Sequence, residues 1–284
     1  PSRMDQVSIN FGPTTQTFLV GKGSAAVPGI AAGIQALHER FGRLPLSTLV
    51  KPAVDAGRNG VPVTPGFERV CELLWPILDQ SDAVRRLFSR NGQPLKAGDT
   101  FYCPQLSNSL EEFGRVGGDY FKTGPGASAL LNHLGENSRL GPSDLLQQQA
   151  RICPALPVPY RDAILWVPNT PSAAGLSLAH SLAEFESGGA VQDPTSFDTI
   201  ERISAALKST FNMRNKPFLT DLFTEGFGST FLKQVQASRT PNTAPTPGHT
   251  THISTADEDG NAVSITHSLG ETAGEVAGDS GILI

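Results

Sequence analysis

Several features that would assign this chain to a common class of protein are scarce or missing. It has 22 Lys and Arg residues against 27 Asp and Glu residues, which gives a net charge of -5. No basic patch stands out in the sequence, so a nucleic-acid partner is not expected. No apolar run approaches the ~18 residues that a membrane-spanning helix needs. No basic-then-apolar leader is present in the chain as given, so the compartment stays open between cytoplasm and periplasm.

Cysteine is also rare. The three cysteines are Cys71, Cys103 and Cys153, and they are scattered. Their spacing matches neither a metal-binding motif nor a disulfide framework. We therefore expect three buried thiols, no metal and no disulfide-stabilised scaffold.

The sequence has enough apolar residues for a packed core, at 38% of 284 residues, in one large domain or two. Apolar residues at helical spacing predict a helix over 30–41, and a second helix over 46–59 with Ser47 as N-cap. Residues 65–90 are predicted to be helical with a break near Pro76. The apolar stripe of the first helix consists of Ile30, Ile34, Leu37 and Phe41.

The most informative stretch lies near the C-terminal end. Residues 240–248 contain three prolines and predict an exposed loop. Residues 253–256 and 262–266 are predicted strands, the second with alternating apolar and small polar residues. Between them, 257–261 predicts a turn in which Gly260 adopts a positive φ. The sequence therefore predicts a β-hairpin that follows a flexible loop.

The junction of loop and hairpin is His249–Thr250. A threonine hydroxyl is a weak nucleophile, but the α-amino group of an N-terminal threonine can act as its base. That amine titrates at about pH 8, so a useful fraction is neutral near pH 7. Cutting the bond before Thr250 would create such an N-terminus. From spacing alone, an ordinary edge hairpin with a Thr-Thr start is the favoured interpretation.

An ordered set of segments resembles the γ-glutamyltranspeptidases, which are N-terminal-nucleophile hydrolases. The matching segments are VPGIAAG (27–33), FGRLPL (41–46), VKPA (50–53), AGRNG (56–60), GDYFKTG (118–124), YR (160–161), PSAAG (171–175), TTH (250–252), DEDGNAVS (257–264) and AGDSGIL (277–283). The resemblance extends from about Val20 to the end of the chain. It implies an α+β fold, part of an αββα sandwich, in which a helix-rich large-subunit portion precedes the C-terminal β-hairpin.

The resemblance also implies a domain organisation and two catalytic residues. Residues 1–239 correspond to the large subunit, 240–249 to a processing loop and 250–284 to the start of the small subunit. Thr250 matches the nucleophile, which also attacks the His249–Thr250 peptide during maturation. Ser268 matches a threonine that hydrogen-bonds the nucleophile, and a serine keeps the hydroxyl. No cofactor or metal is implied.

Two positions depart from the family pattern. Gly270 stands where the family has an asparagine that contacts the γ-glutamyl group, and Gly12 is the best match for an arginine that pairs with the substrate carboxylate. Losing a guanidinium removes the natural clamp for a carboxylate. Asp279 is a candidate for binding the substrate amine. The expected substrate is thus a small γ-glutamyl amide or another acyl amide, as in acylase-like members. The two departures favour the second of these classes.

Family members are usually much longer, so the chain resembles a truncated member. The implied partners are a small-molecule substrate and, after self-cleavage, a heterodimer of large and small subunits. The rival hypothesis is a truncated, non-catalytic relative that serves as a scaffold or binding module. It predicts neither self-cleavage nor turnover of γ-glutamyl or acyl anilides.

Other polar residues leave alternatives open. His252 and His267 flank the hairpin and suggest a Ser/His-type site, a metal pair or a structural role. The acidic turn at 257–259 indicates a solvated turn or a calcium site, although it lacks the ligand spacing of a calcium loop. Arg161 is a candidate for an anion anchor or a structural salt bridge.

Overall fold

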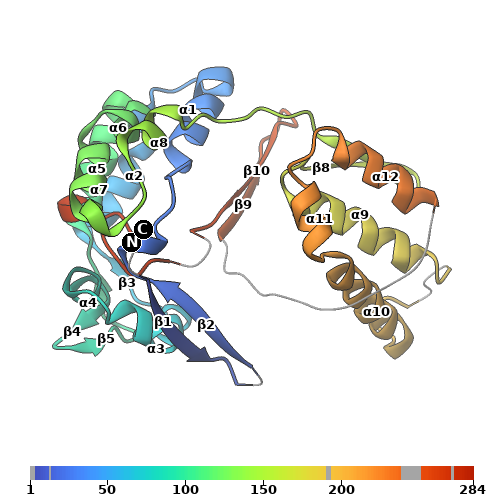
Figure 1. The fold of residues 1–284 in the computed structure, drawn as a ribbon, viewed down its shortest axis with the longest axis horizontal. Coiled ribbons are helices and arrows are strands. Elements are labelled where there is room, and N and C mark those ends of the chain that lie inside the picture. Colours follow the sequence, from blue (N-terminus) through green and yellow to red (C-terminus); the bar gives the residue numbers. More distant parts are fainter. Residues whose placement is uncertain (1–3, 13, 190–192, 238–250, 270–271) are drawn as a thin grey trace. The chain divides into compact units, whose positions relative to one another are not determined.

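The computed structural model describes residues 4–12, 14–189, 193–237, 251–269 and 272–284, and its elements divide into two compact units (Figure 1). The first unit comprises 1–151 and 248–284, and the second comprises 152–247. Helices predominate, and the strands form two-stranded antiparallel pairs. The α+β class is thus confirmed. These two units are defined by how the elements pack. They do not test the predicted cleavage before Thr250, which stays a prediction.

The first unit carries most of the helices. Its elements are β1 (Asp5–Asn10), β2 (Thr15–Val20), η1 (Lys22–Ser24), α1 (Ile30–Phe41), α2 (Leu46–Asn59), β3 (Val61–Pro62), α3 (Pro65–Leu78), α4 (Asp82–Phe88), β4 (Ser89–Arg90), β5 (Gln93–Pro94), β6 (Thr100–Phe101), α5 (Pro104–Val116), α6 (Asp119–Lys122), α7 (Pro125–Leu134), η2 (Gly135–Asn137), α8 (Pro142–Gln147), β9 (Thr251–Ala256), β10 (Ala262–His267) and η3 (Gly278–Ser280). The predicted bounds of α1 and α2 are confirmed. No helix of the described residues is long and apolar enough to cross a membrane.

Two details of the predicted helices are wrong. Ser47 is not an N-cap, because α2 begins one residue earlier at Leu46 and has no side-chain capping hydrogen bond. The break near Pro76 is also misplaced, because α3 continues to Leu78. Pro76 lies in the last turn of α3, and the helix ends two residues after it. The next helix begins only after Ser81, whose hydroxyl accepts a hydrogen bond from the Val84 N–H (3.2 Å).

The predicted apolar stripe of α1 does not face a core within the described residues. The exposed fractions are 42% for Ile30, 36% for Ile34, 38% for Leu37 and 68% for Phe41. The residue that α1 buries is Ala31, which packs against Phe113 and Tyr120. A small side chain lets α1 approach its neighbours closely, so the stripe of large side chains is left on another face.

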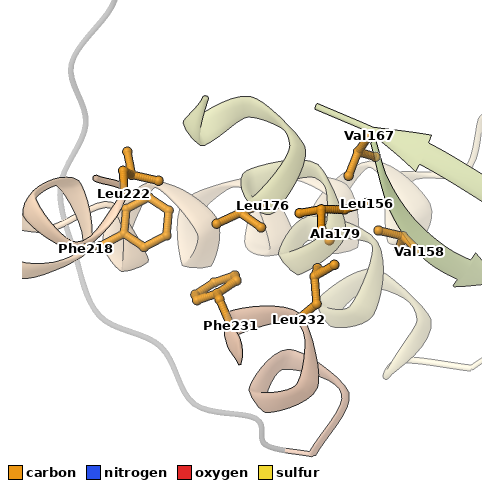
Figure 2. Close-up of a cluster of buried hydrophobic side chains, with 9 residues drawn as sticks. All are labelled: Leu156, Val158, Val167, Leu176, Ala179, Phe218, Leu222, Phe231 and Leu232. Carbon is orange, nitrogen blue, oxygen red and sulfur yellow. The ribbon is translucent and has the colours of Figure 1, made fainter. Parts of the chain in front are cut away.

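The second unit is a β-hairpin packed with helices. Its elements are β7 (Leu156–Tyr160), β8 (Ala163–Val167), α9 (Ala173–Glu186), α10 (Phe197–Met213), α11 (Lys216–Asp221) and α12 (Phe227–Ala237). Its core contains Leu156, Val158, Val167, Leu176, Ala179, Phe218, Leu222, Phe231 and Leu232. Figure 2 shows side chains from both strands and from α9, α11 and α12 converging around Leu176.

Arg161 forms a structural salt bridge in this unit. It lies in the β7–β8 turn with a φ of 55°, and its Nε is 2.8 Å from Glu186 Oε1. Its guanidinium also lies over the Tyr160 ring, 5.1 Å from the ring centre. Both partners of the ion pair are largely exposed, so its contribution to stability is small. The salt-bridge interpretation of Arg161 is therefore confirmed.

A buried histidine joins α9 to α10. His180 is 9% exposed, and its Nδ1 lies 2.9 Å from Thr210 Oγ1, which is 2.7 Å from Ser181 Oγ. Burial lowers the pKa of His180 below its usual value, and Glu184 on the same helix opposes this shift only in part. The folded unit therefore favours a neutral imidazole.

The lowered pKa predicts acid sensitivity. Below about pH 6.5 an unfolded histidine binds a proton, whereas folded His180 binds one only at lower pH. The unfolded state therefore binds more protons in this window, and the free energy of unfolding falls as the pH drops from 7.5 towards 5. Urea midpoints measured by circular dichroism should show this fall for wild type and a smaller one for His180→Gln. Equal pH dependence in both proteins would contradict the prediction.

Candidate functional site

The β9–β10 hairpin has the two strands and the turn that its sequence predicts. Six pairs run from Ala262 opposite Ala256 to His267 opposite Thr251. In the turn, the Asp257 carboxylate accepts hydrogen bonds from the backbone and side-chain amides of Asn261, both at 2.8 Å. The side-chain bond is the main cause of the lowered pKa of Asp257. Gly260 has a φ of 82°, which suits a residue without Cβ. The turn is a solvated one rather than a calcium loop.

The two faces of the hairpin differ. One face carries a hydrogen-bonded polar row, in which His252 Nδ1 is 2.7 Å from Thr266 Oγ1 and Ser254 Oγ is 3.1 Å from Ser264 Oγ. His252 Nε2 is also 2.9 Å from Ser254 Oγ. The opposite face carries the exposed apolar side chains of Ile253, Val263 and Ile265.

This alternation separates the two histidines that the sequence singles out. His267 pairs with Thr251, so it projects from the face opposite His252. The two imidazoles are therefore not brought together as a metal pair. Within the part of the chain that the structure describes, no group of three or more His, Cys, Asp or Glu residues is placed to hold a metal ion.

Three of the predicted site residues, His249, Thr250 and Gly270, lie outside the described residues. Ser268 directly follows β10 and lines a cavity of the first unit. Asp279 lies in η3, is exposed and does not line that cavity. Gly12 lies in the turn between β1 and β2, where its N–H donates to Asn10 Oδ1 (2.8 Å).

The cavity beside Ser268 was not predicted from the sequence. Its volume is about 530 Å³, and all of its lining residues belong to the first unit. Its walls come from the start of α1, from α5 and α6, and from the segments around Ser268 and Ile282. Residues 25–31, which are mostly small and lead into α1, form part of the wall. A volume of this size is typical of a small-molecule site.

The last segment of the chain is fastened against this wall by backbone hydrogen bonds. Ala273 N–H donates to Ile284 O (2.8 Å), and Gly21 N–H donates to Ala273 O (2.6 Å). His133 Nε2 lies 3.1 Å from Glu275 Oε2, joining α7 to the same segment. Gly281 has a φ of 70°, and a Cβ there would lie 2.5 Å from the Leu106 backbone N. Only glycine suits this close approach to α5.

The cysteines fulfil the prediction in two cases of three. Cys71 and Cys103 are buried, and burial raises the pKa of the Cys71 thiol to about 11 and that of Cys103 above its usual value. Both thiols therefore stay protonated and unreactive near neutral pH. Cys153 is exposed, so its predicted burial is wrong. It lies in the irregular segment just before β7.

Comparisons with known proteins agree with the resemblance in the sequence. The family model described as Gamma-glutamyltranspeptidase matches residues 3–284. The glutathione hydrolase proenzyme of Escherichia coli K12 is 26% identical over 296 residues, which cover 96% of this chain and 51% of that protein. The chain spans about half the length of the curated relatives it matches.

Solved structures show the same fold. Cephalosporin acylase from Bacillus halodurans matches with a TM-score of 0.69 at 22% identity, over 93% of this chain and 52% of that one. The γ-glutamyltranspeptidase of Helicobacter pylori matches with a TM-score of 0.63 at 18% identity, over 80% of this chain and 67% of that one. At such identities these likenesses establish the fold alone.

Proposed function

Because the chain belongs to the γ-glutamyltranspeptidase family, we propose that it is an N-terminal-nucleophile amidohydrolase or acyltransferase. In this proposal the chain is cleaved between His249 and Thr250, and Thr250 then serves as the nucleophile. The two products stay associated as a heterodimer of large and small subunits. Neither a metal nor a cofactor takes part in the proposed reaction.

The register of the β9–β10 hairpin carries the proposal. Its last described pair is Thr251 with His267, so one further pair in the same register would set Thr250 opposite Ser268. Opposed residues of an antiparallel pair project from the same face with Cβ atoms about 5 Å apart. In that arrangement the Ser268 hydroxyl is within reach of the Thr250 hydroxyl and orients it, as the family resemblance implies.

The proposed self-cleavage breaks one peptide bond, between His249 and Thr250. Thr250 Oγ attacks the carbonyl carbon of His249, and the C–N bond breaks as the nitrogen takes up the hydroxyl proton. Water hydrolyses the ester that results, which leaves a carboxylate on His249 and an α-amino group on Thr250. An amine of this kind has a pKa of about 8, so it is partly neutral near pH 7 and able to act as a base.

In turnover that amine removes the proton from the Thr250 hydroxyl. The oxygen adds to the carbonyl carbon of a substrate amide, and the leaving amine takes the proton as the C–N bond breaks. Water or an acceptor amine then resolves the acyl ester. The substrate is a γ-glutamyl amide or another acyl amide. Glycines at positions 12 and 270 favour the latter, since neither supplies a side chain to a carboxylate.

An intact mass spectrum of the freshly purified chain, repeated after incubation at neutral pH, tests the proposal. Two species whose masses correspond to 1–249 and 250–284 would support it. A chain that remains whole after prolonged incubation, although folded by circular dichroism, would overturn self-processing and favour the non-catalytic scaffold.

A further inference from the structure

Residues 272–284, here called the anchor segment, fold back on themselves into a closed loop. Ala273 N–H donates to Ile284 O (2.8 Å), and Val276 and Leu283 form an antiparallel bridge. The two limbs of the loop therefore satisfy part of their backbone polar groups within the segment itself. This pairing lets the segment bury its side chains against the rest of the first unit without leaving those groups unpaired.

The anchor segment contributes side chains to three separate hydrophobic clusters of the first unit. Val276 packs in the cluster of α3 and α4, and Ala277 packs in the cluster of α7 and α8. Ile282 packs against the cluster of α1, α5 and α6. Burial of apolar surface is the main favourable term in folding and in most association. One short segment thus joins three parts of the first unit.

Polar contacts with α5 and α7 add to this attachment. Ser109 Oγ on α5 donates to Ser280 O (2.8 Å), and both serines are buried. His133 Nε2 on α7 lies 3.1 Å from Glu275 Oε2, and both of these side chains are largely buried. Removing one partner of a buried polar contact leaves the other without compensation, so these contacts oppose release of the segment.

The β9–β10 hairpin, which precedes the anchor segment, adds little to the attachment. The side chains of β9 are exposed throughout, and those of β10 are exposed up to His267, which is half-buried. Within the described part of residues 250–284, the buried side chains therefore all belong to the anchor segment.

We infer that the anchor segment holds residues 250–284 on the first unit, without a covalent link, once the chain is cut before Thr250. The inference rests on the proposed function for the cut itself, and it names the surface that retains the shorter product. That surface is formed by the three clusters together with Ser109 and His133, all of which precede α12 in the chain. A cut at any bond between α12 and β9 should leave these contacts in place.

A chain cut by an added protease tests the inference independently of self-processing. The full chain would carry Thr250→Ala, and a recognition sequence for a site-specific protease would replace residues 241–247. After cutting, the two fragments should elute together in size-exclusion chromatography at micromolar concentration. Val276→Asp should lower the co-eluting share of the short fragment at least tenfold, because it places a carboxylate at a position that is 3% exposed.

Val263→Asp is the matched control, since Val263 is a mid-strand valine of the same fragment and is 43% exposed. Its fragments should elute together as those of the parent chain do. Separation of the parent fragments, equal release in the Val263 control, or full retention in Val276→Asp would overturn the inference.

Glu275→Ala is a second variant for the event that the uncut Val276→Asp chain does not fold by circular dichroism. It removes the contact with His133 and should speed release of the short fragment at least threefold, as measured by native mass spectrometry after dilution. Glu258→Ala, in the exposed turn of the hairpin, is its control, and equal release rates in the two variants would contradict the inference. Retention of the protease-cut fragments, in a protein whose wild type never cuts itself, would support the anchor and count against the proposed function alone. Separation of those fragments, in a protein whose wild type does cut itself, would overturn the anchor alone.

Discussion

Replacing Thr250 by alanine is expected to keep the chain whole under conditions in which wild type separates into 1–249 and 250–284. Alanine lacks the hydroxyl that attacks the His249 carbonyl, and water alone cleaves a peptide bond too slowly to observe. Loss of the nucleophile should also abolish any cleavage of acyl or γ-glutamyl anilides. Intact mass spectrometry over a time course measures the first effect, and release of p-nitroaniline measures the second.

The neighbouring threonine is the matched control. Thr251 begins β9 and pairs with His267, so its side chain projects from the face opposite to the one that Thr250 would share with Ser268. Thr251→Ala removes the same atoms and should still split, and Thr250→Ser should split because it keeps the hydroxyl. A Thr250→Ala chain that splits, or a Thr251→Ala chain that stays whole while folded, would contradict the assignment of the nucleophile.

The hairpin was predictable from sequence because its determinants are local. Asp257 and Asn261 hydrogen-bond to each other across the turn, and Gly260 supplies the positive φ. Alternating residues then set the register of the strands on either side. Ser268 could be named only by resemblance, since nothing in its own spacing distinguishes a serine after a strand. Its position on a cavity wall depends on long-range packing.

The cavity was beyond sequence reasoning for the same reason. Its walls join α1, α5 and the segment around Ile282, which are distant in the chain. Periodicity correctly predicted α1 and its stripe, but it assumed that an apolar stripe faces a core. The structure buries Ala31 instead and leaves Ile34 at the cavity wall. Which face of a helix is buried depends on the elements that pack against it, and the spacing of its own apolar residues does not identify those elements.

The core of the second unit should be highly sensitive to truncation of one side chain. Leu176 is fully buried and lies in the middle of the cluster in Figure 2. Leu176→Ala removes apolar contacts and leaves a cavity, which typically costs 2–5 kcal/mol, a rough range for buried leucines. That is a large fraction of the roughly 5–15 kcal/mol that stabilises a typical domain. Hydrogen exchange of α9 and α12 amides, read by mass spectrometry, measures the loss within this unit.

Leu178→Ala provides the control on the same helix. Leu178 is 47% exposed, so the same substitution removes little buried surface and should change the stability by less than about 1 kcal/mol. Because the first unit has separate buried clusters, amides of α3 should keep their protection in both variants. Equal losses at Leu176 and Leu178 would contradict the assigned core. Equal loss of protection in α3 and α9 would show instead that the two units unfold as one cooperative body.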